Sequence, residues 1–257
     1  MIRIIRGLLI KTMSSFLANS AKSVLSRLGV FMARQFKGQV TGYDLQRDLS
    51  LVVNKANPVC FDIGANRGQT IHLLQDCLAS PVIHSFEPAS ASYAALAEQS
   101  FGVQVCIHQL ALGEQVGMAE FNTFKHSELN SFLAMNADKG ENLFAEEKII
   151  AVESVRVDTL DSFCTKHDID RIDLLKIDTQ GFELPVLRGA IGLLKQQKIG
   201  TILLELNFAT LYDGQSDPLE ILQLLRSHQM RLVDYYEKER ITGAELSWTT
   251  ALFTLHA

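Results

Sequence analysis

A regular alternation of short apolar stretches with stretches of helical spacing constrains the fold of this chain more than any other feature. Between Pro58 and His108 each apolar stretch is followed by a mixed stretch, in which apolar residues recur among polar ones at helical intervals. This alternation favours a parallel sheet that helices cover on both faces through right-handed crossovers. The elements predicted here are the strand Val59–Ile63, the helix Gln69–Cys77, the strand Val82–Phe86, the helix Ser90–Gln99 and the strand Val103–His108.

The alternation is interrupted and then resumes in the second half of the chain. Two further strands are expected at Gly117–Phe124 and Val152–Val157, separated by the long polar segment Lys125–Ile149, whose length is typical of a functional lid or of disorder. The last two strands have no helix between them, so they must form a hairpin whose final strand runs antiparallel. The remaining predictions are helices at Thr159–His167, Leu184–Lys195 and Pro218–Gln229, and strands at Ile172–Ile177, Thr201–Leu206, Arg231–Tyr236 and Thr249–Leu255.

Charge divides the chain into a short basic arm and an acidic domain. Residues 1–38 hold seven Lys or Arg and no acid, which leaves 17 basic and 29 acidic residues for the rest, or about −12. We therefore expect a basic amphipathic helical arm over residues 1–41 and a separate α/β domain over residues 42–257, to which the family resemblance described below assigns its activity. Residues 1–38 would contact an anionic membrane surface peripherally, or pack on their own domain or on a second copy in a homodimer. The acidic domain argues against nucleic-acid binding.

The compartment follows from the cysteines and from the apolar runs. Cys60, Cys77, Cys106 and Cys164 have no metal-ligand spacing, which indicates reduced thiols in a reducing compartment. Apolar runs near the N-terminus are too short for a membrane span or a signal peptide. We expect a cytoplasmic protein, and peripheral association with the inner face of the membrane stays open as an alternative.

Polar residues at the ends of the first two strands predict a binding site for a nucleoside-containing ligand. The first strand ends in Asp62 and runs through Gly64, Asn66 and Gly68 into a helix, where glycines let a ligand approach the backbone. The spacing is Asp-x-Gly-x-x-x-Gly and not the dinucleotide pattern Gly-x-Gly-x-x-Gly. Glu87 ends the next strand, 19 residues after Gly68, where an acid can accept both hydroxyls of a ribose.

Two later strands end in acids that would face the same crevice. Asp178 follows the apolar strand Ile172–Ile177, with Glu183 shortly after, and Glu205 lies near the end of the next strand. Lys176 within the first of these strands would need an acidic partner such as Asp178 or Glu183. Asp178, Glu205 and Asn207 could together hold Mg²⁺. We favour a hydrogen-bonded network of the same residues and assign no metal site.

Taken together, these motifs resemble the FkbM-type family of S-adenosylmethionine-dependent methyltransferases over about residues 42–255. The segments that carry the resemblance are Phe61–Gln69, Ser85–Pro88, Ala111–Gly113, Lys176–Glu183, Leu187–Ala190 and Leu211–Gln215. The resemblance implies a Rossmann-like class I methyltransferase fold: a three-layer α/β/α arrangement around a seven-stranded, mostly parallel sheet with a C-terminal antiparallel hairpin.

The resemblance also implies an activity and roles for the residues. It implies methyl transfer from S-adenosylmethionine to a hydroxyl of a sugar, glycan or glycosylated natural product. Asp62, Gly64, Asn66 and Gly68 would hold the methionine part of the cofactor and Glu87 its ribose, while Leu110 and Ala111 would border the adenine. Asp178, Glu183 and Glu205 would face the acceptor as catalytic residues. Two alternatives stay open: a catalytically silent S-adenosylmethionine-binding module tethered by its basic arm, and a nicotinamide dehydrogenase.

Overall fold

The structure, a computed structural model, describes residues 38–102, 104–241 and 243–256. The chain separates into residues 1–39 and a compact unit over residues 40–257, and the account below concerns the second unit. The expected basic arm lies outside the described residues except for its last four positions. None of the helices in the described part of the chain is long and apolar enough to cross a membrane.

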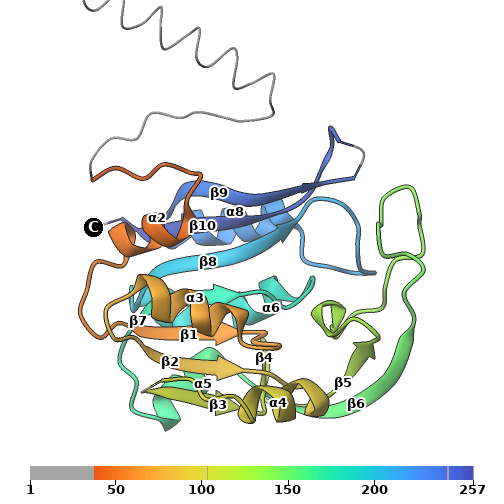
Figure 1. The fold of residues 1–257 in the computed structure, drawn as a ribbon, viewed down its shortest axis with the longest axis horizontal. Helices are drawn as coiled ribbons and strands as arrows, with labels where there is room; N and C mark the ends of the chain where they lie inside the picture. Colours follow the sequence, from red (N-terminus) through yellow and green to blue (C-terminus); the bar gives the residue numbers. More distant parts are fainter. Residues whose placement is uncertain (1–37, 103, 242, 257) are drawn as a thin grey trace, which may run out of the picture. The chain divides into compact units, whose positions relative to one another are not determined.

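A seven-stranded sheet forms the centre of the unit (Figure 1). Its strands lie in the order β3-β2-β1-β7-β8-β10-β9. β1, β2, β3, β7 and β8 pair in parallel, whereas β10 pairs antiparallel with both β8 and β9. The predicted parallel sheet with a C-terminal hairpin is therefore confirmed. The bounds are β1 Val59–Ile63, β2 Val82–Phe86, β3 Val105–His108, β7 Ile172–Ile177, β8 Ile199–Asn207, β9 Met230–Arg240 and β10 Leu246–Leu255.

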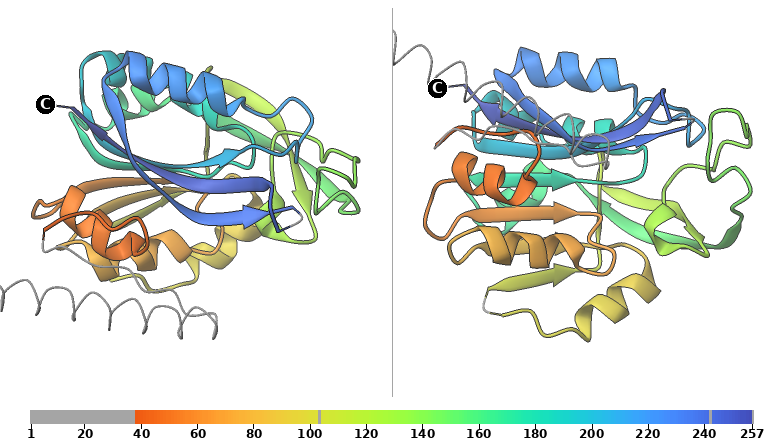
Figure 2. Two further views of the ribbon diagram at one scale, coloured as in Figure 1. Left: turned by 90° about the horizontal axis from the view of Figure 1, so that it is seen from above. Right: turned by 45° about the horizontal axis from the view of Figure 1, so that its top comes forward.

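Helices cover both faces of this sheet, which gives the three predicted layers (Figure 2). On one face Leu49 of α2 and Leu74 of α3 pack with Cys60 and Ile83 of the sheet. On the other face helices α5 to α8 pack against a larger apolar cluster that includes Phe61 and Ile177. All six residues of β7 are buried, as expected for a central parallel strand. The bounds are α2 Leu45–Val52, α3 Gln69–Cys77, α4 Ser90–Ala97, α5 Leu160–Lys166, α6 Glu183–Arg188, α7 Ile191–Lys195 and α8 Pro218–Ser227.

A second, three-stranded sheet stands beside the carboxyl ends of the main strands. Its order is β4-β6-β5, with β4 at Ala111–Leu112, β5 at Gly117–Phe124 and β6 at Ile149–Asp158. The segment between β5 and β6 contains one short helical turn, η1 at Ser127–Leu129. β5 has its predicted bounds, β6 is longer than predicted, and the two-residue β4 was not predicted.

The prediction of one helix over Leu184–Lys195 is wrong, because α6 and α7 are separate. The break lies at Gly189, where a Cβ atom would come within 2.0 Å of the Gly113 carbonyl oxygen. Asp161 of α5 then accepts hydrogen bonds from the amides of Gly192 and Leu193, at 2.7 and 2.9 Å, and so caps the start of α7. Both causes are tertiary contacts that the local sequence does not reveal.

Candidate active site

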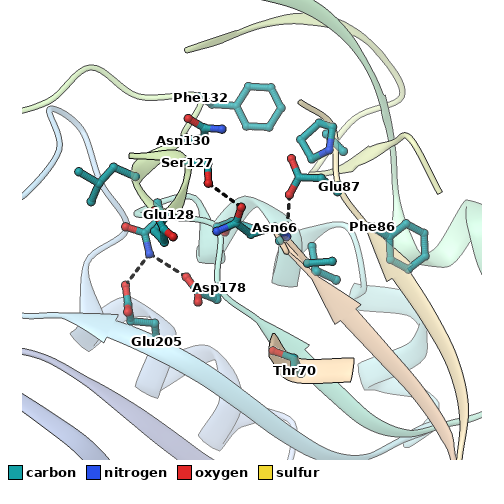
Figure 3. Close-up of a pocket in the computed structure, with 18 of the residues that line it drawn as sticks. Asn66, Thr70, Phe86, Glu87, Ser127, Glu128, Asn130, Phe132, Asp178 and Glu205 are labelled. Atoms are coloured by element: carbon teal, nitrogen blue, oxygen red, sulfur yellow. Dashed lines mark hydrogen bonds between the residues drawn. The ribbon is translucent and has the colours of Figure 1, made fainter. Parts of the chain in front are cut away.

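A cavity of about 360 Å³ opens at the carboxyl ends of β1, β2, β7 and β8 (Figure 3). This is the edge at which open α/β sheets bind their ligands. Of the seven residues predicted to bind the cofactor, five line the cavity, namely Gly64, Asn66, Glu87, Leu110 and Ala111. Asp62 and Gly68 lie behind the lining. Of the three predicted catalytic residues, Asp178 and Glu205 line the cavity and Glu183 does not.

The turn after β1 requires glycine at two positions. Gly64 has φ +80°, and a Cβ atom there would lie 1.9 Å from the carbonyl oxygen of Asp178. Gly68 has φ +87° and precedes α3, where a Cβ atom would meet the ring of Phe101 at 2.7 Å. The turn is held against β2 because the amides of Gly64 and Ala65 both donate to the carbonyl of Phe86, each at 3.0 Å. The backbone of β1 can therefore approach a ligand closely.

Glu87 is buried at the end of β2, with its carboxylate held by two backbone amides. Oε2 accepts from the amide of Asn66 and Oε1 from the amide of Ala89, both at 2.9 Å. Burial raises the pKa of Glu87 to about 7, although these two amides oppose the shift. Figure 3 shows this carboxylate at the cavity wall, linked to Asn66 of the neighbouring turn. A buried, oriented carboxylate at this position can accept hydrogen bonds from a pair of hydroxyl groups.

Asp62 contacts a lysine and not the cavity. It is fully buried, and its Oδ1 lies 3.2 Å from the Nζ of Lys176. The same Nζ donates to the carbonyl of Gly64 at 3.1 Å and lies 3.7 Å from Oδ2 of Asp178. Burial opposes the charge on Lys176, but the carboxylates of Asp62 and Asp178 outweigh it, so that its pKa is raised. The ammonium thus ties the glycine turn to the end of β7, and Asp178 is confirmed as one of its expected partners.

Asp178 and Glu205 meet through the side chain of Gln180. Its Nε2 donates to Oδ1 of Asp178 at 2.8 Å and to Oε1 of Glu205 at 3.3 Å (Figure 3). Its Oε1 accepts from the hydroxyl of Tyr212 at 2.9 Å, which fixes the orientation of the amide. Gln180 itself has φ +54°, a strained conformation for a residue other than glycine. Burial, followed by the nearby Asp178 and Glu183, raises the pKa of Glu205 well above its usual range.

Glu183 lies beneath the turn that presents Asp178. It is buried, and its Oε1 accepts from the amide of Thr179 at 3.0 Å, from the Thr179 hydroxyl at 3.2 Å and from the amide of Gly181 at 3.1 Å. Burial raises its pKa to about 7. These contacts assign Glu183 to holding the turn after β7. Its predicted contact with an acceptor is not supported by this position.

The segment between β5 and β6 covers the cavity. Ser127 of η1 donates through its hydroxyl to Oδ1 of Asn66 at 2.9 Å, and the hydroxyl of Ser131 donates to the carbonyl of Gln180 at 2.7 Å. The segment is thereby attached to the turn after β1 and to the turn after β7. The sequence indicated this segment by its length, and Leu211 belongs to a segment that carries the family resemblance. The sequence offered no sign of a role for the lining residues Phe121, Phe132, Phe144 and Trp248, because none of them lies in a recognisable motif.

Fold and site together define a class I methyltransferase. The glycine turn allows close backbone approach, Glu87 presents an oriented carboxylate at the cavity wall, and apolar residues lie near Leu110. These residues fit S-adenosylmethionine better than a dinucleotide, because the turn lacks the Gly-x-Gly-x-x-Gly arrangement.

Comparison with known proteins identifies the family. The model of the methyltransferase FkbM domain matches residues 62–232, and the chain therefore belongs to the FkbM family of methyltransferases. The chain is 24% identical over 215 residues to a 2-O-methyltransferase, NoeI, of Sinorhizobium fredii, covering 81% of this chain and 87% of that protein. The predicted family, enzyme class and S-adenosylmethionine cofactor are thus confirmed, and the dehydrogenase alternative is disfavoured.

Two solved structures illustrate the spread of similar folds. The methyltransferase domain of METTL16 is 10% identical with a TM-score of 0.47, covering 81% of this chain and 65% of that one. Aeropyrum pernix fibrillarin is 12% identical with a TM-score of 0.44, covering 79% and 68%.

The cysteines and the metal alternative can be examined within the described residues. All four cysteines are free thiols, as predicted. In the described part of the chain no three His, Cys, Asp or Glu side chains group as metal ligands, and Asn207 does not line the cavity. The amide of Gln180 lies between Asp178 and Glu205, where the magnesium alternative would need an ion.

Proposed function

We propose that the protein transfers the methyl group of S-adenosylmethionine to a hydroxyl group of a sugar or glycan. The observation that carries the proposal is the pair of acids, Asp178 and Glu205, that line the same cavity as the glycine turn and Glu87. A relative named as a 2-O-methyltransferase supports transfer to oxygen. The ordered network around these acids argues against the silent binding module.

The cofactor would be held along the turn after β1. Gly64 and Asn66 would contact its methionine part, Glu87 would accept hydrogen bonds from the ribose hydroxyls, and Leu110 and Ala111 would border the adenine. When bound, the cofactor supplies an electrophilic methyl group on a sulfonium. The protein contributes mainly by positioning, because an in-line methyl transfer needs no covalent intermediate.

Asp178 is proposed to orient the acceptor hydroxyl and to take up its proton. Lys176 and Gln180 hold the two oxygens of its carboxylate from opposite sides, so that its position is set before the acceptor binds. Glu205 lines the cavity beside Asp178, and burial raises its pKa; it is proposed to hydrogen-bond to a neighbouring hydroxyl of the same acceptor and not to act as the base. Glu183 would act indirectly, by holding the turn that carries Asp178.

The role of Asp178 can be tested with Asp178→Asn and with Asp213→Asn as a matched control. Asp213 is an exposed aspartate that does not line the cavity. We expect Asp178→Asn to keep its affinity for S-adenosylhomocysteine, measured by calorimetry, and to lose about 10²- to 10⁴-fold in methyl transfer to glycan extracts. Unchanged turnover would contradict the role given to Asp178. Transfer to nitrogen or carbon, seen by mass spectrometry of the product, would contradict the proposed reaction.

We further propose that residues 1–41 form an arm distinct from the methyltransferase domain and bring the enzyme to an anionic membrane surface in the cytoplasm. The support is the seven basic residues and the absence of acids in residues 1–38. Deletion of residues 1–38 should release the protein from vesicles that contain phosphatidylglycerol and leave methyl transfer intact. Retained vesicle binding would contradict the proposal.

A further inference from the structure

A second cavity, of about 320 Å³, adjoins the first on the side of α2 and α3. The two share five lining residues: Gln69, Thr70, Lys176, Asp178 and Glu205. We propose that this second cavity holds the acceptor, and that it takes an uncharged, hydroxylated ring such as a neutral pyranoside. The inference rests on the proposed function and extends it by assigning the acceptor a site and a charge.

Because Asp178 and Glu205 line both cavities, these two acids lie where the first cavity meets the second. The first cavity includes Glu87 and the apolar residues around Leu110, which suit a nucleoside, and it is also lined by Phe144, Leu211 and Trp248. Its volume is at the small end of the range for sites that hold one small ligand. An acceptor therefore needs room on the other side of Asp178 and Glu205, and the second cavity provides it. A ligand in each cavity would bring the two reactants together at these acids.

The walls of the second cavity suit a ring that has one apolar face and a polar edge. Leu45 of α2 and Leu73 of α3 form an apolar wall. Thr250 of β10 also lines the cavity, and its hydroxyl donates to Oε2 of Glu237 at 2.7 Å. Thr250 is the register partner of Glu205, so its hydroxyl lies on the strand next to the acid that is shared with the first cavity. Sugar rings present this combination of C–H face and hydroxyl edge.

The charge of the lining disfavours anionic acceptors. Two carboxylates, Asp178 and Glu237, line the cavity with one basic residue, Lys176; Glu205 also lines it, but its raised pKa favours the neutral form. That lysine is already paired with Asp62 and with Asp178. A carboxylate or phosphate on the acceptor would therefore meet like charge without a free cation in the cavity lining. The cavity should reject uronic acids and phosphorylated sugars.

The test uses direct binding of glycosides, measured by saturation-transfer NMR on the full-length protein saturated with S-adenosylhomocysteine. Methyl β-glucopyranoside is the neutral probe and methyl β-glucuronide the acidic one. Wild-type protein should bind the neutral probe and not the acidic one. Thr250→Phe, which fills the cavity, should weaken binding of the neutral probe at least about tenfold, a change of about 1.4 kcal/mol. Its affinity for S-adenosylhomocysteine, measured by calorimetry, should stay near that of wild type.

Thr254→Phe is the matched control. It lies on the same strand and the same face as Thr250, four residues away, and lines neither cavity. Glu237→Gln provides a second variant at an exposed position, where folding is not at risk, and should admit the acidic probe. The inference is overturned if wild-type protein does not bind the neutral probe. It is also overturned if folded Thr250→Phe binds that probe as Thr254→Phe does, or if Glu237→Gln leaves discrimination unchanged.

Failure of the inference can be told apart from failure of the proposed function. Methyl transfer from labelled S-adenosylmethionine to hydroxyl groups of a whole-cell extract does not depend on where the acceptor binds. If that transfer occurs while Thr250→Phe has no effect on binding, the reaction stands and the assigned site is wrong. If products carry the label on nitrogen or carbon, the proposed function is wrong as well.

Discussion

Lys176 provides the sharpest test of how the site is held together. Its ammonium is almost completely buried and lies 3.2 Å from the fully buried carboxylate of Asp62. Replacing it with methionine keeps most of the volume of the side chain and removes the charge. Asp62 would then be left buried without its cation, and the carbonyl of Gly64 would lose its donor. Both groups belong to the turn that is proposed to bind the cofactor.

The size of the effect follows from the geometry. At 3.2 Å, and with an effective dielectric constant of about 20, the attraction between the two charges is about 5 kcal/mol. Desolvation of both ions offsets much of this attraction in the folded protein, so the pair adds little net stability. Removing only one partner keeps the desolvation cost of the other. We therefore expect Lys176→Met to lower the free energy of unfolding by about 3–5 kcal/mol.

A double-mutant cycle measures this coupling. The variants are Lys176→Met, Asp62→Asn and their combination, unfolded with urea in the absence of cofactor. Because the double variant contains neither charge, it should be more stable than Lys176→Met alone, with a coupling energy of at least about 2 kcal/mol. Lys198→Met is the control, since the ion pair of Lys198 with Asp170 is exposed, and its stability should stay close to that of wild type.

Two results would refute the reasoning. One is a Lys176→Met variant that loses no more stability than Lys198→Met, which would mean that water or a neighbouring donor replaces the ammonium. The other is additivity in the cycle, which would mean that Lys176 and Asp62 contribute independently despite their contact.

Three further predictions concern the turn, the proposed ribose acceptor and a half-buried histidine. Gly64→Ala should lower the free energy of unfolding by at least about 2 kcal/mol, because φ is +80° and the new Cβ atom would lie 1.9 Å from the Asp178 carbonyl. Calorimetry should find no binding of S-adenosylhomocysteine to this variant, and wild-type affinity would contradict the prediction. The affinity of the protein for S-adenosylhomocysteine should fall as the pH drops below about 7, where Glu87 takes up a proton and its carboxylate no longer accepts a pair of hydrogen bonds. Glu87→Gln should bind weakly at every pH, and the same pH dependence in that variant would show that Glu87 is not the titrating group. Burial lowers the pKa of His108 to about 4, so the stability of wild type relative to His108→Gln should be greatest above about pH 6.5 and decline as the pH falls towards 4. Urea unfolding of both proteins at several pH values measures this difference in stability, and a difference that does not change with pH would contradict the prediction.

The alternation of strands and helices could be predicted from the sequence because it reflects local backbone preferences and burial. The strand Ile172–Ile177 has its predicted bounds, since a short, mostly apolar segment between two helices is typical of a buried central strand of a parallel sheet. The split into α6 and α7 could not be predicted, because the cap at the start of α7 comes from Asp161, which is distant in sequence.

The sequence by itself determined the class of fold, the family and the edge of the sheet at which the site lies. The sequence could place Gly64, Glu87 and Asp178 around one cavity because parallel strands bring their carboxyl ends together, and strand ends can be read from the chain. Only the tertiary structure decided which way the neighbouring side chains point. It turned Asp62 inwards onto Lys176, placed Glu183 beneath the turn, and opened a second cavity beside Thr250. The physical reason is that a buried charge or a cavity depends on the partners that packing brings together, and those partners are far apart in the sequence.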